Sequence, residues 1–235
     1  MAAPFARDAL IFDVDGTLAE TEELHRQAFN RAFAEAGLSW HWTVADYRRL
    51  LATTGGRERI FRFLEAVEPA RARELGSHEA PFVRALHARK TEFYARGVAE
   101  GAVALCPGIA DLVARARGLG MALAIATTTS RANVEALLAA HPEALPVEAF
   151  AVRVCGEDTA RKKPDPEVYR IALDRLGVAA DRALAVEDSR NGVLAAKAAG
   201  LRVVAIPSLY SAGDDLSAAD LVLASAAELV PLLAR

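Results

Sequence analysis

Short apolar runs that alternate with helical segments constrain the fold of this chain more strongly than any other feature. Six runs have the length and composition of buried strands: Asp8 to Phe12, Met121 to Ala126, Ala149 to Val154, Ala183 to Val186, Arg202 to Ile206 and, more weakly, Leu221 to Leu223. Helical patterns follow most of them, over Ile109 to Leu119, Arg131 to Ala140, Pro166 to Leu176, Asn191 to Ala199 and Ala226 to Leu233. Strands that alternate with helices build parallel sheets, so we predict an α/β fold whose functional site lies beyond the carboxyl ends of the strands.

The segment from residue 19 to residue 104 interrupts this alternation, because it shows helical patterns and no convincing strand. Side chains recur there at the spacing of one helix face in two stretches, His25, Ala28, Phe29, Ala32, Phe33 and Ala36, and then Ile60, Phe63, Leu64 and Val67. We therefore predict a core domain of residues 1–18 and 105–235, with a helical domain of residues 19–104 inserted after the first strand.

Composition and charge bound the classes of protein to which the chain can belong. Its 235 residues, 53% apolar and 25% charged, suffice for one large or two modest folded domains. A net charge of −3 argues against general nucleic-acid binding, and no apolar segment is long enough to cross a bilayer. The N-terminus lacks the pattern of a secretory signal, so we expect a cytoplasmic protein without nucleic-acid or membrane partners. Cys106 and Cys155 are isolated, which predicts buried free thiols.

Two carboxylates, Asp13 and Asp15, follow the first predicted strand. Alternation along an extended chain points both to the same side, where like charges repel unless a metal ion or a proton lies between them. The pair is thus a candidate for metal binding, nucleophilic attack or acid–base catalysis. The alternative is a simple turn, because Asp15-Gly16 is a common turn dipeptide.

Three further strand ends carry polar groups of a matching kind. Thr127 to Ser130 offers hydroxyl and N–H groups to an anion, Lys163 offers a positive charge, and Glu187 with Asp188 forms a second carboxylate pair. Simpler explanations are N-capping by the hydroxyls, a solvated basic turn, and capping of the next helix by Asp188 or Ser189. Those explanations predict no relation among the sites. Hydroxyl and lysine groups suit a phosphoryl group, and clustered carboxylates suit Mg²⁺, so we predict a site for both.

The four sites, in this order, resemble the motifs of the haloacid dehalogenase superfamily: Asp13-Val14-Asp15-Gly16-Thr17, Thr127, Lys163-Pro164 and Glu187-Asp188-Ser189. The resemblance covers essentially the whole chain, and it implies a Rossmann-like core, an inserted helical cap domain and Mg²⁺ as cofactor. Two cap segments, Ala19 to His25 and Thr53 to Arg59, are similar to those of CbbY-type sugar-bisphosphate phosphatases, which are related to β-phosphoglucomutase and phosphoglycolate phosphatase. That narrower resemblance implies xylulose 1,5-bisphosphate as substrate and a place in carbohydrate metabolism, in the Calvin cycle.

The resemblance also implies a role for each core residue. Asp13 would be the nucleophile that forms an aspartyl-phosphate, and Asp15 would protonate the leaving sugar oxygen and then activate water. Asp13, the backbone carbonyl of Asp15 and Asp188 would hold Mg²⁺, with Glu187 as a direct ligand or a support. The groups in contact with the phosphoryl group would be Asp13, Asp15, Thr127, Thr128 and Lys163.

The cap is expected to choose the substrate, because the core motifs contact only the phosphoryl group. Gly55 and Gly56, before a predicted helix, leave N–H groups free, and Arg57 and Arg59 add forked donors that suit a second phosphate. The candidate substrate residues of the cap are Glu22, His25, Gly55, Gly56, Arg57, Glu58, Arg59, His87 and Lys90. His25 also falls on the apolar stripe, which is typical of a packed histidine, and Trp40-His41-Trp42 favours a hydrophobic cap core over a stacking surface.

The resemblance implies a phosphatase that converts xylulose 1,5-bisphosphate, a small phosphorylated sugar, into xylulose 5-phosphate, and we expect a monomer. A β-phosphoglucomutase-like mutase is an alternative, since His25, Arg57 and Lys90 are similar in position to cap residues of that family. A sugar-phosphate sensor without turnover is an alternative of another class, although Asp13 and Asp15 are both retained. Nucleotide-dependent chemistry is disfavoured, because no G-x-G-x-x-G motif follows the first strand and no P-loop is present.

Overall fold

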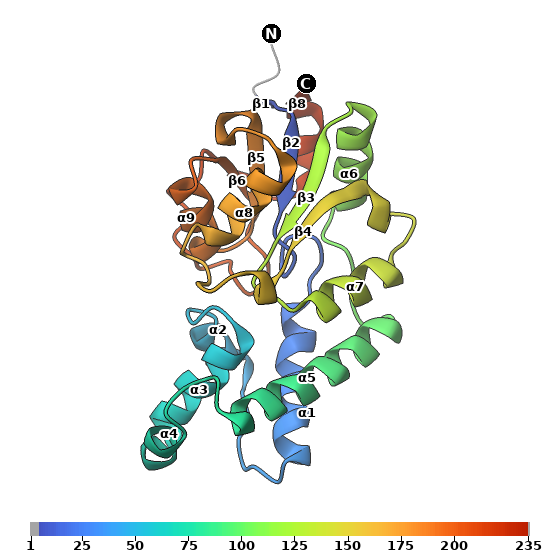
Figure 1. Ribbon diagram of the computed structural model, residues 1–235. Helices are drawn as coiled ribbons and strands as arrows, with labels where there is room; N and C mark the ends of the chain where they lie inside the picture. The colour runs from blue at the N-terminus through green and yellow to red at the C-terminus, as the bar shows by residue number, and fades with distance from the viewer. Residues whose placement is uncertain (1–4, 235) are drawn as a thin grey trace. The chain divides into compact units, whose positions relative to one another are not determined.

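The computed structural model describes residues 5–234, so residues 1–4 and 235, which the predicted core domain includes, lie outside it (Figure 1). The chain forms two compact units, which we call the core unit (Met1–Thr21 and Val103–Arg235) and the helical unit (Glu22–Ala102). Their bounds differ from the predicted ones by a few residues. The reason is that the two connecting segments pair with each other, since Ala19 bridges Leu105 and the Glu20 N–H donates to the Ala104 carbonyl at 3.0 Å.

The core unit is built on a six-stranded parallel sheet with the order β4-β3-β2-β5-β6-β7. Its strands are β2 (Ala9–Phe12), β3 (Ala122–Ala126), β4 (Phe150–Val154), β5 (Ala183–Glu187), β6 (Arg202–Ala205) and β7 (Leu221–Val222). The predicted α/β class is confirmed. Because β2 is central and the chain continues first to one side and then to the other, the end of β2 lies where the strand order reverses, which is where ligands bind in such sheets.

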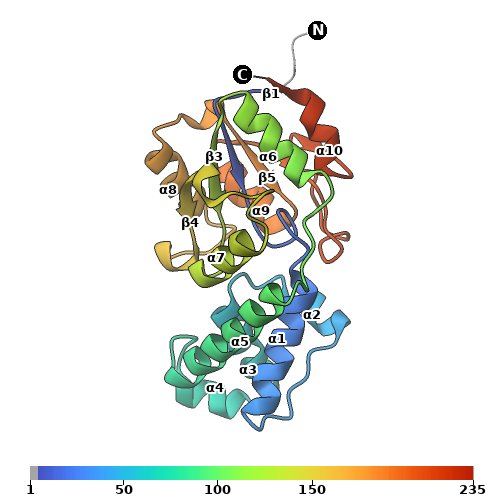
Figure 2. The same ribbon diagram turned by 90° about the vertical axis from the view of Figure 1, so that its right-hand side faces the viewer.

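The two faces of the sheet carry side chains of different size, with more alanine on one face than on the other. In β2, Ala9 and Ile11 point to one face and Leu10 and Phe12 to the other, and all four are fully buried. The face with Ala9 and Ile11 is rich in alanine and packs against α8 (Glu167–Leu176) and α9 (Arg190–Ala198). Helices α6 (Ile109–Gly118) and α10 (Ala226–Leu229) lie on the opposite side (Figure 2), so both faces are covered.

The chain ends of the described part form a feature that the sequence patterns did not predict. Two-residue strands, β1 (Phe5–Ala6) and β8 (Leu233–Ala234), pair in parallel. The last predicted helix is too long, because α10 ends at Leu229 and a 3₁₀ turn over Val230–Leu232 leads into β8. Pro231 explains the difference, since proline has no N–H to continue an α-helix.

The helical unit has its own aromatic core. Its helices are α1 (Glu22–Glu35), α2 (Val44–Leu50), α3 (Gly56–Val67), α4 (Pro69–Leu75) and α5 (Pro81–Ala99). Trp42 is fully buried against Phe29, Phe33 and Phe63, with ring centroids 4.7 to 5.5 Å apart. The Trp40 indole also packs there and donates to Glu68 Oε1 at 2.7 Å. These contacts confirm the prediction that the Trp40 to Trp42 segment forms a hydrophobic core.

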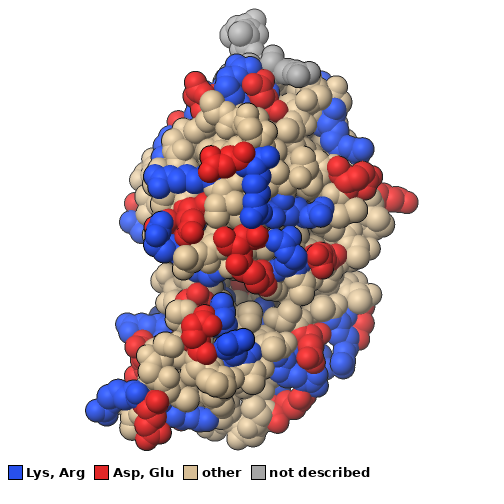
Figure 3. All heavy atoms as spheres, in the orientation of Figure 1, with Lys and Arg blue, Asp and Glu red and all other residues tan. Residues whose placement is uncertain are grey.

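The two cysteines are buried, and charged side chains lie on the surface (Figure 3). Cys106 and Cys155 are buried free thiols, as predicted, and burial raises the pKa of Cys106 to about 12. Acidic and basic side chains intermingle over the face shown in Figure 3. Within residues 5–234, no helix combines the length and the hydropathy needed to cross a membrane.

Candidate active site

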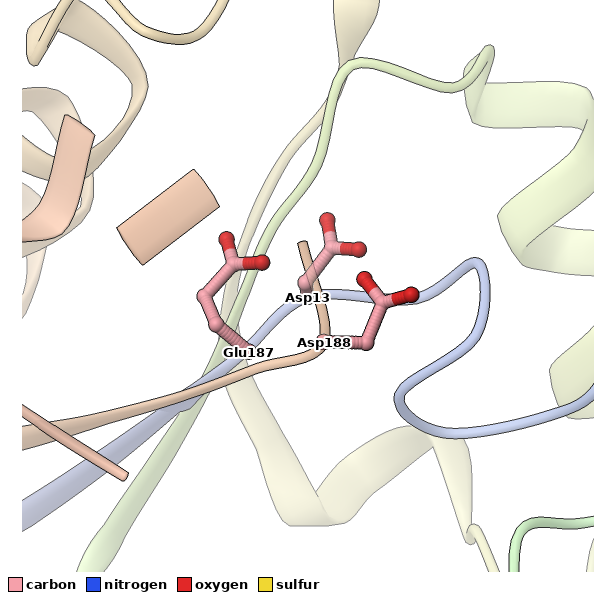
Figure 4. Close-up of side chains that lie close together, drawn as sticks. All are labelled: Asp13, Glu187 and Asp188. Atoms are coloured by element: carbon pink, nitrogen blue, oxygen red, sulfur yellow. The ribbon is translucent and has the colours of Figure 1, made fainter. Parts of the chain in front are cut away.

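Strand register brings three carboxylates together at the ends of β2 and β5. Phe12 pairs with Val186, so the next residues of the two strands, Asp13 and Glu187, are neighbours, and the Asp13 N–H donates to the Val186 carbonyl at 3.1 Å. Asp188 follows directly. Oxygen atoms of Asp13, Glu187 and Asp188 lie within 4.8 Å of one another, and Figure 4 shows the three carboxyl groups side by side. Two motifs that are distant in sequence thus form one acidic cluster.

Lys163 joins this cluster as a buried cation. Its Nζ donates to Asp13 Oδ1 at 2.7 Å and to Glu187 Oε1 at 2.6 Å, and its side chain is 4% exposed. The neighbouring basic residues have other partners, since Arg161 pairs with Asp165 at 2.6 Å and Lys162 bonds the Gly156 carbonyl. The basic turn is therefore solvated at Arg161, while Lys163 is committed to the carboxylates.

Tyr169 is a site residue that sequence reasoning missed. It lies on α8, fully buried, and its hydroxyl donates to Glu187 Oε1 beside Lys163, whose Nζ is 5.1 Å from the Tyr169 ring centroid. The predicted helix Pro166 to Leu176 includes Tyr169, to which the sequence patterns assigned no role. A usable signal was present, because a tyrosine on a buried helix face requires a partner for its hydroxyl.

Carboxylates outnumber the ammonium group in this cluster, because Lys163 pairs with Asp13 and Glu187 and Asp188 adds a third carboxylate. Burial raises the pKa of Asp13 to about 7, with Lys163 opposing and Glu187 reinforcing the shift. Burial also raises the pKa of Asp188 well above its usual range, and Asp13 adds to the effect. Against the effect of burial, Asp13 and Glu187 raise the pKa of Lys163. An added cation would favour the ionised carboxylates, since opposite charge lowers their pKa values.

The residues present fit a hard divalent cation. Glu187 Oε2 is buried and has no hydrogen-bond partner among the described residues, which is costly unless a ligand satisfies it. The other donors of the cluster are also carboxylate oxygens, the ligands that Mg²⁺ prefers. Asp15 lies near enough to Asp13 for its charge to add to the rise in the Asp13 pKa, in line with the expected carboxylate pair. Its Oδ1 accepts a bond from the Thr21 hydroxyl at 2.6 Å, and its carboxyl is not part of the three-residue cluster.

Thr127 presents a hydroxyl at the end of the neighbouring strand β3. Its N–H continues the sheet to the Val154 carbonyl at 3.0 Å, and its Oγ1 accepts the Thr129 N–H at 3.2 Å. The hydroxyl proton is thereby left to donate to an anion. Thr128 follows in the turn before α7 (Arg131–Ala140) and is partly buried.

Helix capping was the simpler explanation for the polar groups after β3 and β5. In both places the capping residue is a serine, Ser130 or Ser189. Ser130 caps α7 by accepting the Asn133 N–H at 3.4 Å, and Ser189 caps α9 by accepting the Gly192 N–H at 3.2 Å. Thr127 and Asp188 are therefore not used as caps. Their side chains remain for the site.

The helical unit contains a second cluster of candidate residues, centred on Lys90. Its Nζ lies 2.5 Å from His25 Nδ1 and 4.9 Å from the Phe29 ring centroid, and Lys90 is 3% exposed. His25 stacks on Tyr94 at 4.1 Å, so it is a packed histidine that also contacts a buried ammonium. His87 is partly buried nearby, and burial, with Lys90 and then Arg57 adding to the effect, lowers its pKa to about 3.

The remaining cap candidates divide into two environments. Arg59 is buried and donates to the Tyr47 hydroxyl at 2.8 Å, which in turn donates to Glu22 Oε2 at 2.8 Å. Arg57 is more exposed and pairs with Glu79 at 2.8 Å. Gly55 adopts φ +96 as the residue before α3, and a side chain there would collide with Glu58. Gly56 begins α3 against the His87 ring.

Asp13, a carboxylate at the end of a central parallel strand and paired with an ammonium group, is a candidate nucleophile in a protein of the α/β class. The chain matches the haloacid dehalogenase-like hydrolase family over residues 7–200 and belongs to that family. It is a phosphatase of the haloacid dehalogenase type.

Individual relatives agree with this assignment. Protein CbbY of Rhodobacter capsulatus is 53% identical over 213 residues, which are 90% of each chain. A crystal structure of CbbY from Rhodobacter sphaeroides in complex with phosphate has a TM-score of 0.86 and 49% identity, covering 95% of this chain and 96% of that one. A mutant of that protein in complex with xylulose 1,5-bisphosphate gives the same values.

Proposed function

We propose that the protein is a magnesium-dependent cytoplasmic phosphatase that converts xylulose 1,5-bisphosphate into xylulose 5-phosphate and inorganic phosphate. The observation that carries the proposal is the acidic cluster of Asp13, Glu187 and Asp188 at the end of the central strand, with Lys163 paired to Asp13 and Glu187. The likeness to a CbbY protein whose structure contains xylulose 1,5-bisphosphate supports this choice of substrate.

Asp13 is the proposed nucleophile. A bond forms between its carboxylate oxygen and phosphorus while the bond between phosphorus and the sugar oxygen breaks, which gives an aspartyl-phosphate. Asp15 gives a proton to the leaving sugar oxygen and then takes a proton from the water that cleaves the intermediate. Lys163 and the Thr127 hydroxyl offset the negative charge of the phosphoryl oxygens. Asp13, Asp188 and the Asp15 carbonyl would hold Mg²⁺, with Glu187 as a direct ligand or a support, and the ion would supply positive charge between carboxylate and phosphate.

The helical unit is proposed to act as the cap that recognises the second phosphate of the substrate. Lys90 and Arg57 supply positive charge, and the start of α3 at Gly56 supplies N–H groups. Arg59 is proposed to support this group from within the unit, since it already bonds Tyr47.

The decisive test is phosphate release from xylulose 1,5-bisphosphate, with one phosphate expected per molecule consumed and a much slower reaction of the monophosphate product. Asp13→Asn should lower kcat by about 1,000-fold or more, because the nucleophile is lost. Asp8→Asn is the matched control just before the start of the same strand, where Asp8 pairs with Arg182 away from the acidic cluster. It should leave kcat unchanged.

Three other outcomes would overturn the proposal. Conversion of β-glucose 1-phosphate into glucose 6-phosphate without phosphate release would establish a mutase. Tight binding of a phosphorylated sugar without turnover would establish a sensor. Full activity in excess chelator would exclude Mg²⁺, whereas we expect chelation to abolish activity, Mg²⁺ to restore it and Ca²⁺ to support it poorly because of its larger, looser coordination.

A further inference from the structure

Two serines that no sequence motif included converge on the same oxygen of Asp188. The Ser208 hydroxyl donates to Asp188 Oδ2 at 2.7 Å, and the Ser211 hydroxyl donates to the same atom at 2.9 Å. Both serines come from the segment that follows β6, and both are buried, at 4% and 7% exposure. The residues of one loop thus fix one side of a carboxylate that lies in the acidic cluster.

The two serines also contact each other, because their hydroxyl oxygens lie 2.8 Å apart. The Ser208 N–H donates to Ser211 Oγ at 2.8 Å, and the Ser211 N–H donates to Ser208 Oγ at 3.3 Å. Each hydroxyl oxygen therefore accepts a backbone N–H, and its single proton is available for the carboxylate. Both hydroxyls donate to Asp188 Oδ2. Neither serine donates to Asp188 Oδ1.

The turn after the proposed nucleophile, Asp13 to Thr17, packs against Asp188 and Ser208. Gly16 has φ +78, and a Cβ atom there would lie 2.9 Å from Ser208 Cβ and would collide with the Asp188 carboxyl. Glycine is thus required where the Asp13 to Thr17 turn packs against Asp188 and Ser208. Asp188 is enclosed between this turn and the serine loop, which leaves its carboxyl little freedom to rotate.

We propose that Ser208 and Ser211 are positioning residues for metal binding: they hold Oδ2 of Asp188 and so present Oδ1 to Mg²⁺. This inference rests on the proposed magnesium-dependent function. A carboxylate with both oxygens free can rotate or bind a cation through either or both of them. Two fixed donors on one oxygen select a single orientation, in the way that outer hydrogen-bond partners orient metal ligands in other sites.

The test measures Mg²⁺ binding by calorimetry, and Mn²⁺ binding by electron paramagnetic resonance, without substrate. The Ser208→Ala/Ser211→Ala double variant should bind either ion about 10- to 100-fold more weakly than wild type, and each single variant should fall between the two. The Mg²⁺ concentration for half-maximal activity should rise by a similar factor, while kcat at saturating Mg²⁺ should change much less. Ser217→Ala, an exposed position of the same segment, is the control and should bind as wild type does.

The outcomes separate this inference from the proposed function. Wild-type affinity in the double variant, with an intact fold by circular dichroism, would overturn the positioning role and leave the proposed function standing. Absence of Mg²⁺ binding in the wild type would overturn the proposed metal itself. If the double variant unfolds, the single variants supply the same test, because a purely structural role would lower their melting temperature without changing their metal affinity.

Discussion

Gly192, the third residue of α9, is the point where a helix touches the proposed metal ligand Glu187. A Cβ atom at this position would overlap the Glu187 carboxyl group. The backbone of Gly192 is helical, so its conformation does not require glycine. Glycine costs a helix about 1 kcal/mol relative to alanine, which means that the site keeps a locally unfavourable residue to make room for Glu187.

Gly192→Ala should therefore favour α9 while it damages the site. We expect kcat/KM to fall by about 10- to 100-fold, because the displaced Glu187 carboxyl loses its position beside Lys163. The measurement is steady-state phosphate release together with thermal unfolding. Gly118→Ala in α6 is the matched control, since its Cβ would meet nothing within 4 Å. It should stabilise the protein by up to about 1 kcal/mol with unchanged kinetics, and unchanged kinetics in Gly192→Ala would contradict the account.

At the scale of the element, helix α3 places two arginines, Arg57 and Arg59, in different environments. Residues two apart on an α-helix point about 200° apart, because each residue turns the helix by about 100°. Arg59 accordingly points into the helical unit and bonds Tyr47, whereas Arg57 points outward to Glu79. Arg57 is the arginine that can exchange its present partner for a ligand.

Arg57→Ala should weaken turnover of the bisphosphate selectively. The expected loss in kcat/KM is about 1.5 to 3 kcal/mol, or about 10- to 150-fold, as for removal of a hydrogen bond to a charged group. Small monophosphates should be spared, because they have no second phosphate to hold. Arg62→Ala on the same helix, where a 68% exposed side chain pairs with Glu65, is the control and should affect neither substrate class. Equal losses on both classes would show that Arg57 has only a structural role.

At the scale of the whole molecule, two units with separate cores can be followed separately as they unfold. The chain has two tryptophans, Trp40 and Trp42, and both belong to the helical unit. Tryptophan fluorescence therefore reports on that unit, while far-UV circular dichroism reports on both. His87 lies in the helical unit as well, among Lys90, Arg57, His25 and Arg59, so its protonation couples pH to the stability of this unit.

The stability of the helical unit should fall as the pH is lowered from about 6.5 towards 3. The folded His87 stays neutral because its pKa is lowered to about 3, whereas the unfolded chain takes up a proton near pH 6.5. The unfolded state thus binds more protons in this window, and the free energy of unfolding drops by up to about 1.4 kcal/mol per pH unit. Urea unfolding at pH 7, 6 and 5 measures the slope. His87→Gln should flatten it, and His41→Gln at an exposed position should not; an unchanged slope in His87→Gln would contradict the assignment.

Much of the fold could be predicted because period-two and helical patterns are local properties of the chain. The central strands and helix α7 were predicted within one residue of their observed bounds, and the paired strands β1 and β8 were not, since two residues carry no periodicity. The main site residues could be predicted for a related reason. Parallel strands share one carboxyl edge, so Asp13, Thr127 and Glu187 had to lie at that edge, and they meet there because β3 and β5 flank β2.

Only the tertiary structure decided how those residues are partnered. Strand register made Glu187 the neighbour of Asp13, while Asp15, two residues from Asp13 in sequence, bonds Thr21 instead. Chain segments distant in sequence brought Tyr169 to Glu187, and the serine pair to Asp188. By itself the sequence determined which chemical groups reach the edge of the sheet, because alternation and strand ends are set locally. Their pairing depends on the packing of helices and loops against one another, since hydrogen-bond distances between remote residues exist only after the chain has folded.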